Sequence, residues 1–223
     1  RLLDSGAIDA ADDLEDLLAS AAAAGLATAH DREWSVTDAG ERWLTASTAV
    51  RWETIAEGFR SALPRGLRTA ADGFLAPQAW SAVYPLDPDW PAHAERLRRI
   101  GARWGLLAPD GSDAELPWTA ALRAGERADA ATMAPYLPAE IDRVYLQADL
   151  TAIAPGPLAP HLDLRLRSIA LRESRAQAST YRFTAESIAA GMTEGETAES
   201  MREFLAGLSL TGIPQPLAYL IES

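Results

Sequence analysis

The chain has 223 residues, of which 48% are hydrophobic and 23% charged, values ordinary for a folded soluble protein. It contains no Cys. It also contains no Lys, so all 20 of its Lys and Arg residues are Arg. Disulfides, thiolate metal sites, a Walker A loop and Schiff-base chemistry are therefore excluded in this chain. No apolar run approaches the roughly 18 residues that span a bilayer, so we expect a cytoplasmic protein with no membrane partner. The absence of a signal peptide and of an initiator Met at Arg1 indicates a fragment or a processed chain.

The net charge of −12 argues against general attraction to DNA phosphates. The acidity is uneven, since residues 1–49 hold ten acidic residues and only three arginines. We expect three segments along the chain, over residues 1–49, 50–140 and 141–223.

The first segment, residues 1–49, predicts a helix, a two-stranded hairpin and a second helix. Residues 12–24 place leucines at helical spacing, and "LATAHDREWSV" alternates around a polar tip. Thr37 is suited to cap the helix that follows, "DAGERWLTAS". This order is typical of the C-terminal half of a winged-helix domain, so we expect a partial winged-helix-like unit.

The second segment, residues 50–140, predicts the same order in more complete form. "VRWETIAEGFRSAL" is a helix ended by Pro64, "PQAWSAVY" is a short second one, and Pro91 opens "PAHAERLRRIGARWGLL". Asp110-Gly111 is a strong turn signal, which predicts a hairpin within "LLAPDGSDAELPWTA". We therefore expect a second winged-helix-like unit. Chance similarity between amphipathic segments is the alternative.

The third segment, residues 141–223, mixes strands with helices. "VYLQADLTAI" and "STYRFT" predict strands, and "LDLRLRSIALRESRA" predicts a helix. Thr184 is expected to cap "AESIAAGM", and a further helix buries Met201, Phe204, Leu205 and Leu208. "IPQPLAYLI" is expected as an extended apolar tail. The fold class is therefore α+β, mainly α, with two winged-helix-like units followed by a small α+β domain.

Several ordered motifs of the last segment resemble the helicase-associated domain of bacterial, especially actinobacterial, XPB-like proteins. They are "LQADLTAIAPGPL", "LRESRAQASTYRFTAESIAAGMT", "FLAGLS" and "IPQPLAYLI", within residues 143–223. The resemblance implies a domain that engages DNA or assists damage recognition beside a helicase motor in DNA repair. It brings no motor to this chain, since neither a Walker A, a Walker B "DExH" nor an arginine-finger motif occurs in it.

The best nucleic-acid candidate is the helix near residues 91–104. Its arginines lie mostly on one face, where they suit phosphate forks and guanine edges: Arg96, Arg98, Arg99 and Arg103. The alternative is a solvated face that pairs with the chain's surplus carboxylates. By contrast, the corresponding helix of the first segment would repel phosphates through its acids, which are Asp9, Asp12, Asp13, Glu15 and Asp16.

Other candidate residues favour structural roles. We expect ion pairing with Asp163, Glu173 or Glu186 for the second basic cluster, made of Arg165, Arg167, Arg172, Arg175 and Arg182. We expect core packing rather than base stacking for Trp34, Trp43, Trp104 and Trp118. Metal binding is not expected at the isolated His30, His93 and His161. Asp149 is a polar residue in an apolar strand, where it is expected to cap or to pair locally with an Arg.

These features predict a non-catalytic, DNA-related accessory module with no cofactor, no metal and no catalytic residue. It would bind DNA phosphates through four arginines, Arg96, Arg98, Arg99 and Arg103. The alternative is a protein–protein adaptor that docks a partner of the repair or transcription machinery and does not bind DNA. A hydrolase is the third and least favoured class, because no nucleophile elbow or phosphate-binding glycine loop occurs.

Overall fold

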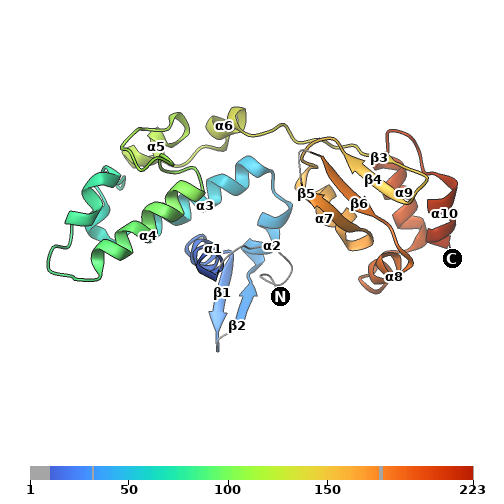
Figure 1. Ribbon diagram of the computed structural model, residues 1–223, viewed down its shortest axis with the longest axis horizontal. Coiled ribbons are helices and arrows are strands. Elements are labelled where there is room, and N and C mark those ends of the chain that lie inside the picture. The colour runs from blue at the N-terminus through green and yellow to red at the C-terminus, as the bar shows by residue number, and fades with distance from the viewer. Residues whose placement is uncertain (1–10, 32, 176–177, 223) are drawn as a thin grey trace. The chain divides into compact units, whose positions relative to one another are not determined.

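A computed structural model describes residues 11–31, 33–175 and 178–222 (Figure 1). The chain divides into two compact units, the first comprising residues 1–43 and 48–136, and the second residues 44–47 and 137–223. Over the described ranges the fold is α+β and mainly α, as predicted. Asp9 of the predicted acidic helix lies outside the described residues.

The first unit begins with a helix, a hairpin and a helix, as predicted: α1 (Ala11–Ala23), β1 (Ala27–His30), β2 (Glu33–Val36) and α2 (Asp38–Thr45). Thr37 caps α2, because its Oγ1 accepts the Gly40 N–H at 3.0 Å. The unit continues with helices α3 (Thr48–Ala62), α4 (Trp90–Arg103), α5 (Ala120–Ala124) and α6 (Ala130–Met133), with short 3₁₀ helices η1 (Arg65–Leu67), η2 (Pro77–Ala82), η3 (Pro117–Thr119) and η4 (Ala134–Tyr136).

The hairpin predicted around Asp110-Gly111 is wrong, because residues 105–116 form turns without a strand. Two causes are visible. The N–H groups of Leu106 and Leu107 both bond the Gly101 carbonyl and so cap α4 instead of pairing with a strand. Asp110 also folds onto its own turn, since its Oδ1 accepts the Ser112 N–H at 3.0 Å. The second segment therefore lacks the wing that was expected of it.

The second unit is an antiparallel sheet in the order β3-β4-β6-β5, with helices against one face (Figure 1). Its elements are β3 (Tyr145–Leu146), β4 (Thr151–Ala154), α7 (Pro160–Ile169), β5 (Leu171–Arg175), β6 (Ser179–Arg182), α8 (Ala185–Thr193), α9 (Ala198–Leu208) and α10 (Gln215–Glu222). The core face of the sheet carries Leu146, Ala152, Ala154 and Tyr181, which pack with the apolar sides of the helices. Thr184 caps α8 with a full capping box, as predicted.

Three details of this unit differ from the predictions. The run "VYLQADLTAI" is two strands joined by a turn, in which Asp149 accepts the Thr151 hydroxyl at 2.6 Å. The predicted long helix ends at Ile169, and the next residues form strand β5, paired with β6. The predicted apolar tail is helix α10, because its prolines lie in or before the first turn and Leu217 and Ile221 are buried on one side.

Candidate functional site

The four arginines of the candidate nucleic-acid site lie on α4, as the sequence predicts. Pro91 stands in the first turn of this helix, where its missing N–H costs no hydrogen bond. Ala94 and Gly101 are buried on the opposite side, whereas Ile100, four residues after Arg96, is buried beside the arginines. Three of the guanidinium groups, those of Arg96, Arg99 and Arg103, point away from Ala94 and Gly101 and toward a neighbouring helix.

What faces them is helix α1, whose acids occupy the place expected for phosphates. The Asp16 carboxylate accepts the Arg96 Nε–H at 2.9 Å on one oxygen and the Arg99 Nε–H at 2.8 Å on the other. Its side chain is only 1% exposed. Burial raises the pKa of this carboxyl, but the hydrogen bonds from Arg99 and Arg96 outweigh burial, so the pKa lies below its ordinary value.

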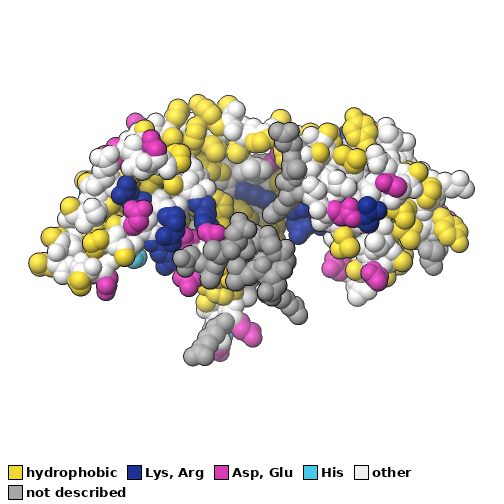
Figure 2. Space-filling model, viewed as in Figure 1, with side chains coloured by type: hydrophobic (Ala, Val, Ile, Leu, Met, Phe, Trp, Pro, Cys, Tyr) yellow, Lys and Arg dark blue, Asp and Glu magenta, His cyan; other side chains and the backbone are white. Residues whose placement is uncertain are grey.

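The same two helices make further contacts along their length. Arg103 pairs with Asp13, and an Arg96 terminal nitrogen lies 3.9 Å from Glu15. Trp104, which follows α4, donates its indole N–H to the Ser20 hydroxyl at 2.9 Å. We call this set of contacts between α1 and α4 the acid–arginine seam. Figure 2 shows acidic and arginine side chains gathered together over these elements.

Arg98 is placed differently, in a small hollow beside α4. One terminal nitrogen lies 3.5 Å from Glu95, and the other donates to the Gly111 carbonyl at 3.1 Å. The hollow has a volume of about 240 Å³ and an apolar floor that includes Pro77 and Leu107. Arg98 thus fastens the loop that replaces the expected hairpin.

The charges of the arginine face are balanced within the unit. Four guanidinium groups meet four carboxylates, those of Asp13, Glu15, Asp16 and Glu95. The side chains of the four arginines keep between 26% and 46% exposure, so they are reached by solvent. The structure thus shows the alternative given for these arginines, a face that pairs with the chain's carboxylates. The sequence did not indicate that most of these carboxylates belong to the acidic helix.

Four members of the second basic cluster pair within their own unit, as predicted: Arg165, Arg167, Arg172 and Arg182. The partner of Arg165 is Glu196, which was not among the three expected carboxylates. Arg165 grips Glu196 with two hydrogen bonds, of 2.7 and 2.9 Å, and Arg182 pairs with Glu173. Arg172 donates to Asp163 at 3.1 Å, and the same carboxylate accepts the Tyr181 hydroxyl at 2.6 Å. These arginines hold strands and helices together.

The tryptophan prediction has a mixed outcome. Trp43, Trp104 and Trp118 are half-buried, but Trp34 is 45% exposed on the hairpin, so core packing is wrong for that residue. His93 stacks on Trp90, and His30 lies beside Asp31 on the surface. Among the described residues, no group of three or more His, Asp or Glu side chains could hold a metal ion.

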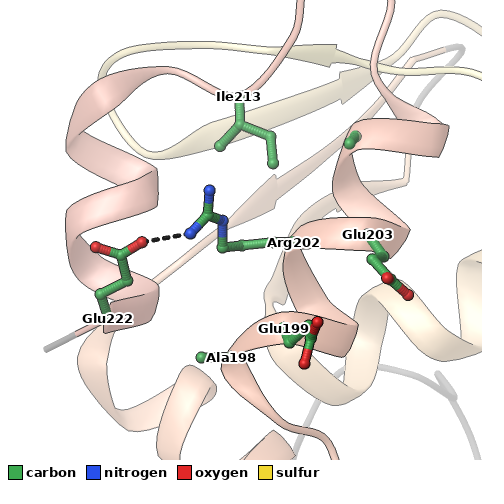
Figure 3. Close-up of a pocket in the computed structure, with 7 residues that line it drawn as sticks. Ala198, Glu199, Arg202, Glu203, Ile213 and Glu222 are labelled. Atoms are coloured by element: carbon green, nitrogen blue, oxygen red, sulfur yellow. Dashed lines mark hydrogen bonds and ion pairs between the residues drawn. The ribbon is translucent and has the colours of Figure 1, made fainter.

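A surface that the sequence analysis missed is an open groove between α9 and α10 (Figure 3). Its volume is about 650 Å³, and its lining combines acids with small apolar side chains. Arg202 reaches across from α9 to the Glu222 carboxylate on α10 at 2.6 Å. The only sequence signal for it was the exposed side of the α9 segment, which repeats acids at helical spacing.

Comparison with known families finds a match within the second unit. Residues 144–223 match the model of the helicase conserved C-terminal domain. This confirms the helicase-related resemblance of the last segment at that level. No curated protein matches the chain. Among the described residues, no helix has both the length and the apolarity that crossing a membrane requires.

Proposed function

We propose that this chain is a non-catalytic accessory module of helicase-related machinery, and that it acts as a protein–protein adaptor. The helicase-related part of the proposal follows from the domain at residues 144–223. The adaptor part is carried by one observation, the pairing of the candidate DNA-binding arginines with the carboxylates of α1 and α4. An XPB-like identity, a role in DNA repair and a cytoplasmic location in an actinobacterium belong to this proposal through the motif resemblance.

The physical reason is that phosphate affinity comes from releasing counterions from DNA by uncompensated positive charge. A guanidinium already bonded to a carboxylate releases few counterions and must first lose its partner. Breaking these ion pairs costs the most free energy at Asp16. Without its two guanidinium partners, this buried carboxylate would be desolvated and unpaired. The acid–arginine seam therefore supports a structural role for α4.

The second candidate function is DNA contact through Arg96, Arg98, Arg99 and Arg103. It is favoured by the partial exposure of these side chains, which leaves part of each reachable from solvent. A winged-helix-like first segment, with its projecting hairpin, belongs to the same candidate. Here α4 would serve as the recognition helix, and α1 would have to move aside.

Binding of a fluorescent 20-base-pair duplex, followed by anisotropy from 25 to 200 mM salt, separates the two candidates. The adaptor proposal expects no binding tighter than about 10⁻⁴ M at physiological salt, the weak end of the range for nonspecific DNA binding. Binding that weakens steeply with salt, and whose slope drops by about 1 in Arg98→Gln, would establish the DNA candidate. Arg127→Gln is the matched control, because Arg127 is 83% exposed and lies outside α4. The same titrations with single-stranded DNA test whether the chain binds that form of DNA instead of the duplex.

A further inference from the structure

The groove between α9 and α10 has two walls and an apolar floor. Its α9 wall consists of residues spaced three and four apart, so that Glu199, Arg202 and Glu203 share one side of the helix. The floor includes Ala198 and Ile213, which are half-buried and pack against the core of the second unit. The floor is therefore a fixed surface, continuous with the core.

The charge of the groove is negative. Three carboxylates line it, those of Glu199, Glu203 and Glu222, against the single guanidinium of Arg202. Arg202 forms an ion pair with Glu222, and both side chains of that pair are more than half exposed. Exposed ion pairs contribute little to stability, so an incoming cation can replace Arg202 on Glu222 at small cost. Glu199 and Glu203 can hold a second cation between them, although Glu203 also lies in the electrostatic field of Arg165.

We propose that this groove docks a basic, amphipathic segment of a partner protein. Arginine or lysine side chains of the segment would pair with the carboxylates, and their aliphatic stems, together with an apolar neighbour, would cover Ala198 and Ile213. The occupant is argued from charge complementarity combined with the apolar floor. The inference rests on the proposed adaptor function and gives its partner a chemistry.

Other occupants fit the groove less well. Nucleic acid is disfavoured because three carboxylates would face its phosphates. A purely apolar helix would leave those carboxylates desolvated without partners. A second copy of this chain is disfavoured by its net charge of −12, which opposes self-association.

The test uses the whole chain and a fluorescent twelve-residue peptide that carries arginines and leucines four residues apart. We expect saturable binding, with chemical-shift changes centred on the Ile213 methyl groups. A peptide with citrulline in place of arginine keeps the shape and loses the charge, and it is expected to bind at least tenfold more weakly. The double variant Glu199→Gln/Glu203→Gln is expected to weaken binding about tenfold.

The matched control is Glu186→Gln/Glu194→Gln, which removes the same charge from exposed positions of α8 and its C-terminal end, outside the groove lining. It is expected to change binding less than twofold. Equal weakening by both double variants, equal binding of the citrulline peptide, or shift changes away from Ile213 would overturn the inference. So would occupation of the groove by a second copy, seen as a dimer by sedimentation. The proposed function is tested separately, by DNA titration. If neither the peptide nor DNA binds, the groove is not the docking site, but the adaptor proposal still stands.

Discussion

The Asp16 carboxylate on α1 accepts a hydrogen bond from Arg99 on α4 at 2.8 Å, although 83 positions separate the two residues in the chain. The bond joins the most acidic helix of the first unit to its most basic one. In the sequence, the acidic face and the candidate phosphate-binding face are two separate features. In the structure, they form one contact inside the first unit.

Replacing Asp16 with Asn should destabilise the first unit by about 2 kcal/mol, because one acceptor oxygen becomes an NH2 donor. One of the two guanidinium hydrogen bonds is then lost and the other loses its charge assistance. All seven tryptophans lie in this unit, so urea unfolding followed by tryptophan fluorescence reports on it. Glu15→Gln is the control: Glu15 is exposed and lies 3.9 Å from Arg96, so its loss should cost less than 1 kcal/mol. Equal losses in the two variants would contradict a special role for Asp16.

The acid sensitivity of the first unit should change in the same variant. The folded state holds the pKa of Asp16 below its ordinary value, so it favours the carboxylate. The stability this provides is present above the unfolded pKa of about 3.9 and is lost as the pH falls through the lower, folded value. The unfolding free energy of Asp16→Asn should therefore fall less steeply than that of the wild type below about pH 4. Parallel pH profiles for the two proteins would show that Asp16 does not titrate as proposed.

Much of the fold is predictable from local signals. The helices at α1, α3, α4, α8 and α9 follow from apolar spacing, and the caps at Thr37 and Thr184 follow from a short polar side chain before a helix. The failures lie where tertiary contacts override such signals. Asp110-Gly111 has the composition of a hairpin turn, but the Gly101 carbonyl takes the N–H groups that a strand would need.

The candidate site shows the same limit. Helical spacing correctly placed Arg96, Arg99 and Arg103 on one side of α4, away from Ala94 and Gly101. It carried no information on which element faces that side, because the pairing of α1 with α4 depends on how both helices pack within the unit. Ion pairing within the second unit was predictable, since its acids outnumber its arginines, and Arg172 and Arg182 do pair with the expected Asp163 and Glu173. The partner of Arg165 was not, because Glu196 lies 31 residues away in the chain.

Tyr181 should remain protonated well above the pH at which a solvated phenol ionises. Its pKa is raised to about 12, first by burial and then by its hydrogen bond to Asp163. The stability from the neutral phenol is thus present below the unfolded pKa of about 10 and is lost as the pH rises toward 12. The absorbance difference at 295 nm between the wild type and Tyr181→Phe should have its midpoint near 12. A midpoint near 10 would contradict the buried hydrogen bond.

Two helical glycines of the second unit should respond to alanine in opposite directions. A Cβ at Gly207 in α9 meets no atom within 4 Å, so Gly207→Ala should stabilise the unit by about 0.5 kcal/mol by restricting the unfolded chain. A Cβ at Gly191 in α8 would lie 2.6 Å from the Ile169 side chain, which is buried in the core, so Gly191→Ala should destabilise it by about 1–3 kcal/mol. Amide hydrogen exchange in β4 and β6 measures the second unit without interference from the first. Since the residue change is the same in both variants, helix propensity alone would raise protection at both positions. Lower protection from exchange in Gly191→Ala alone would show that α8 packs closely on α7 at this position. That contact belongs to the same core against which the floor of the α9–α10 groove packs.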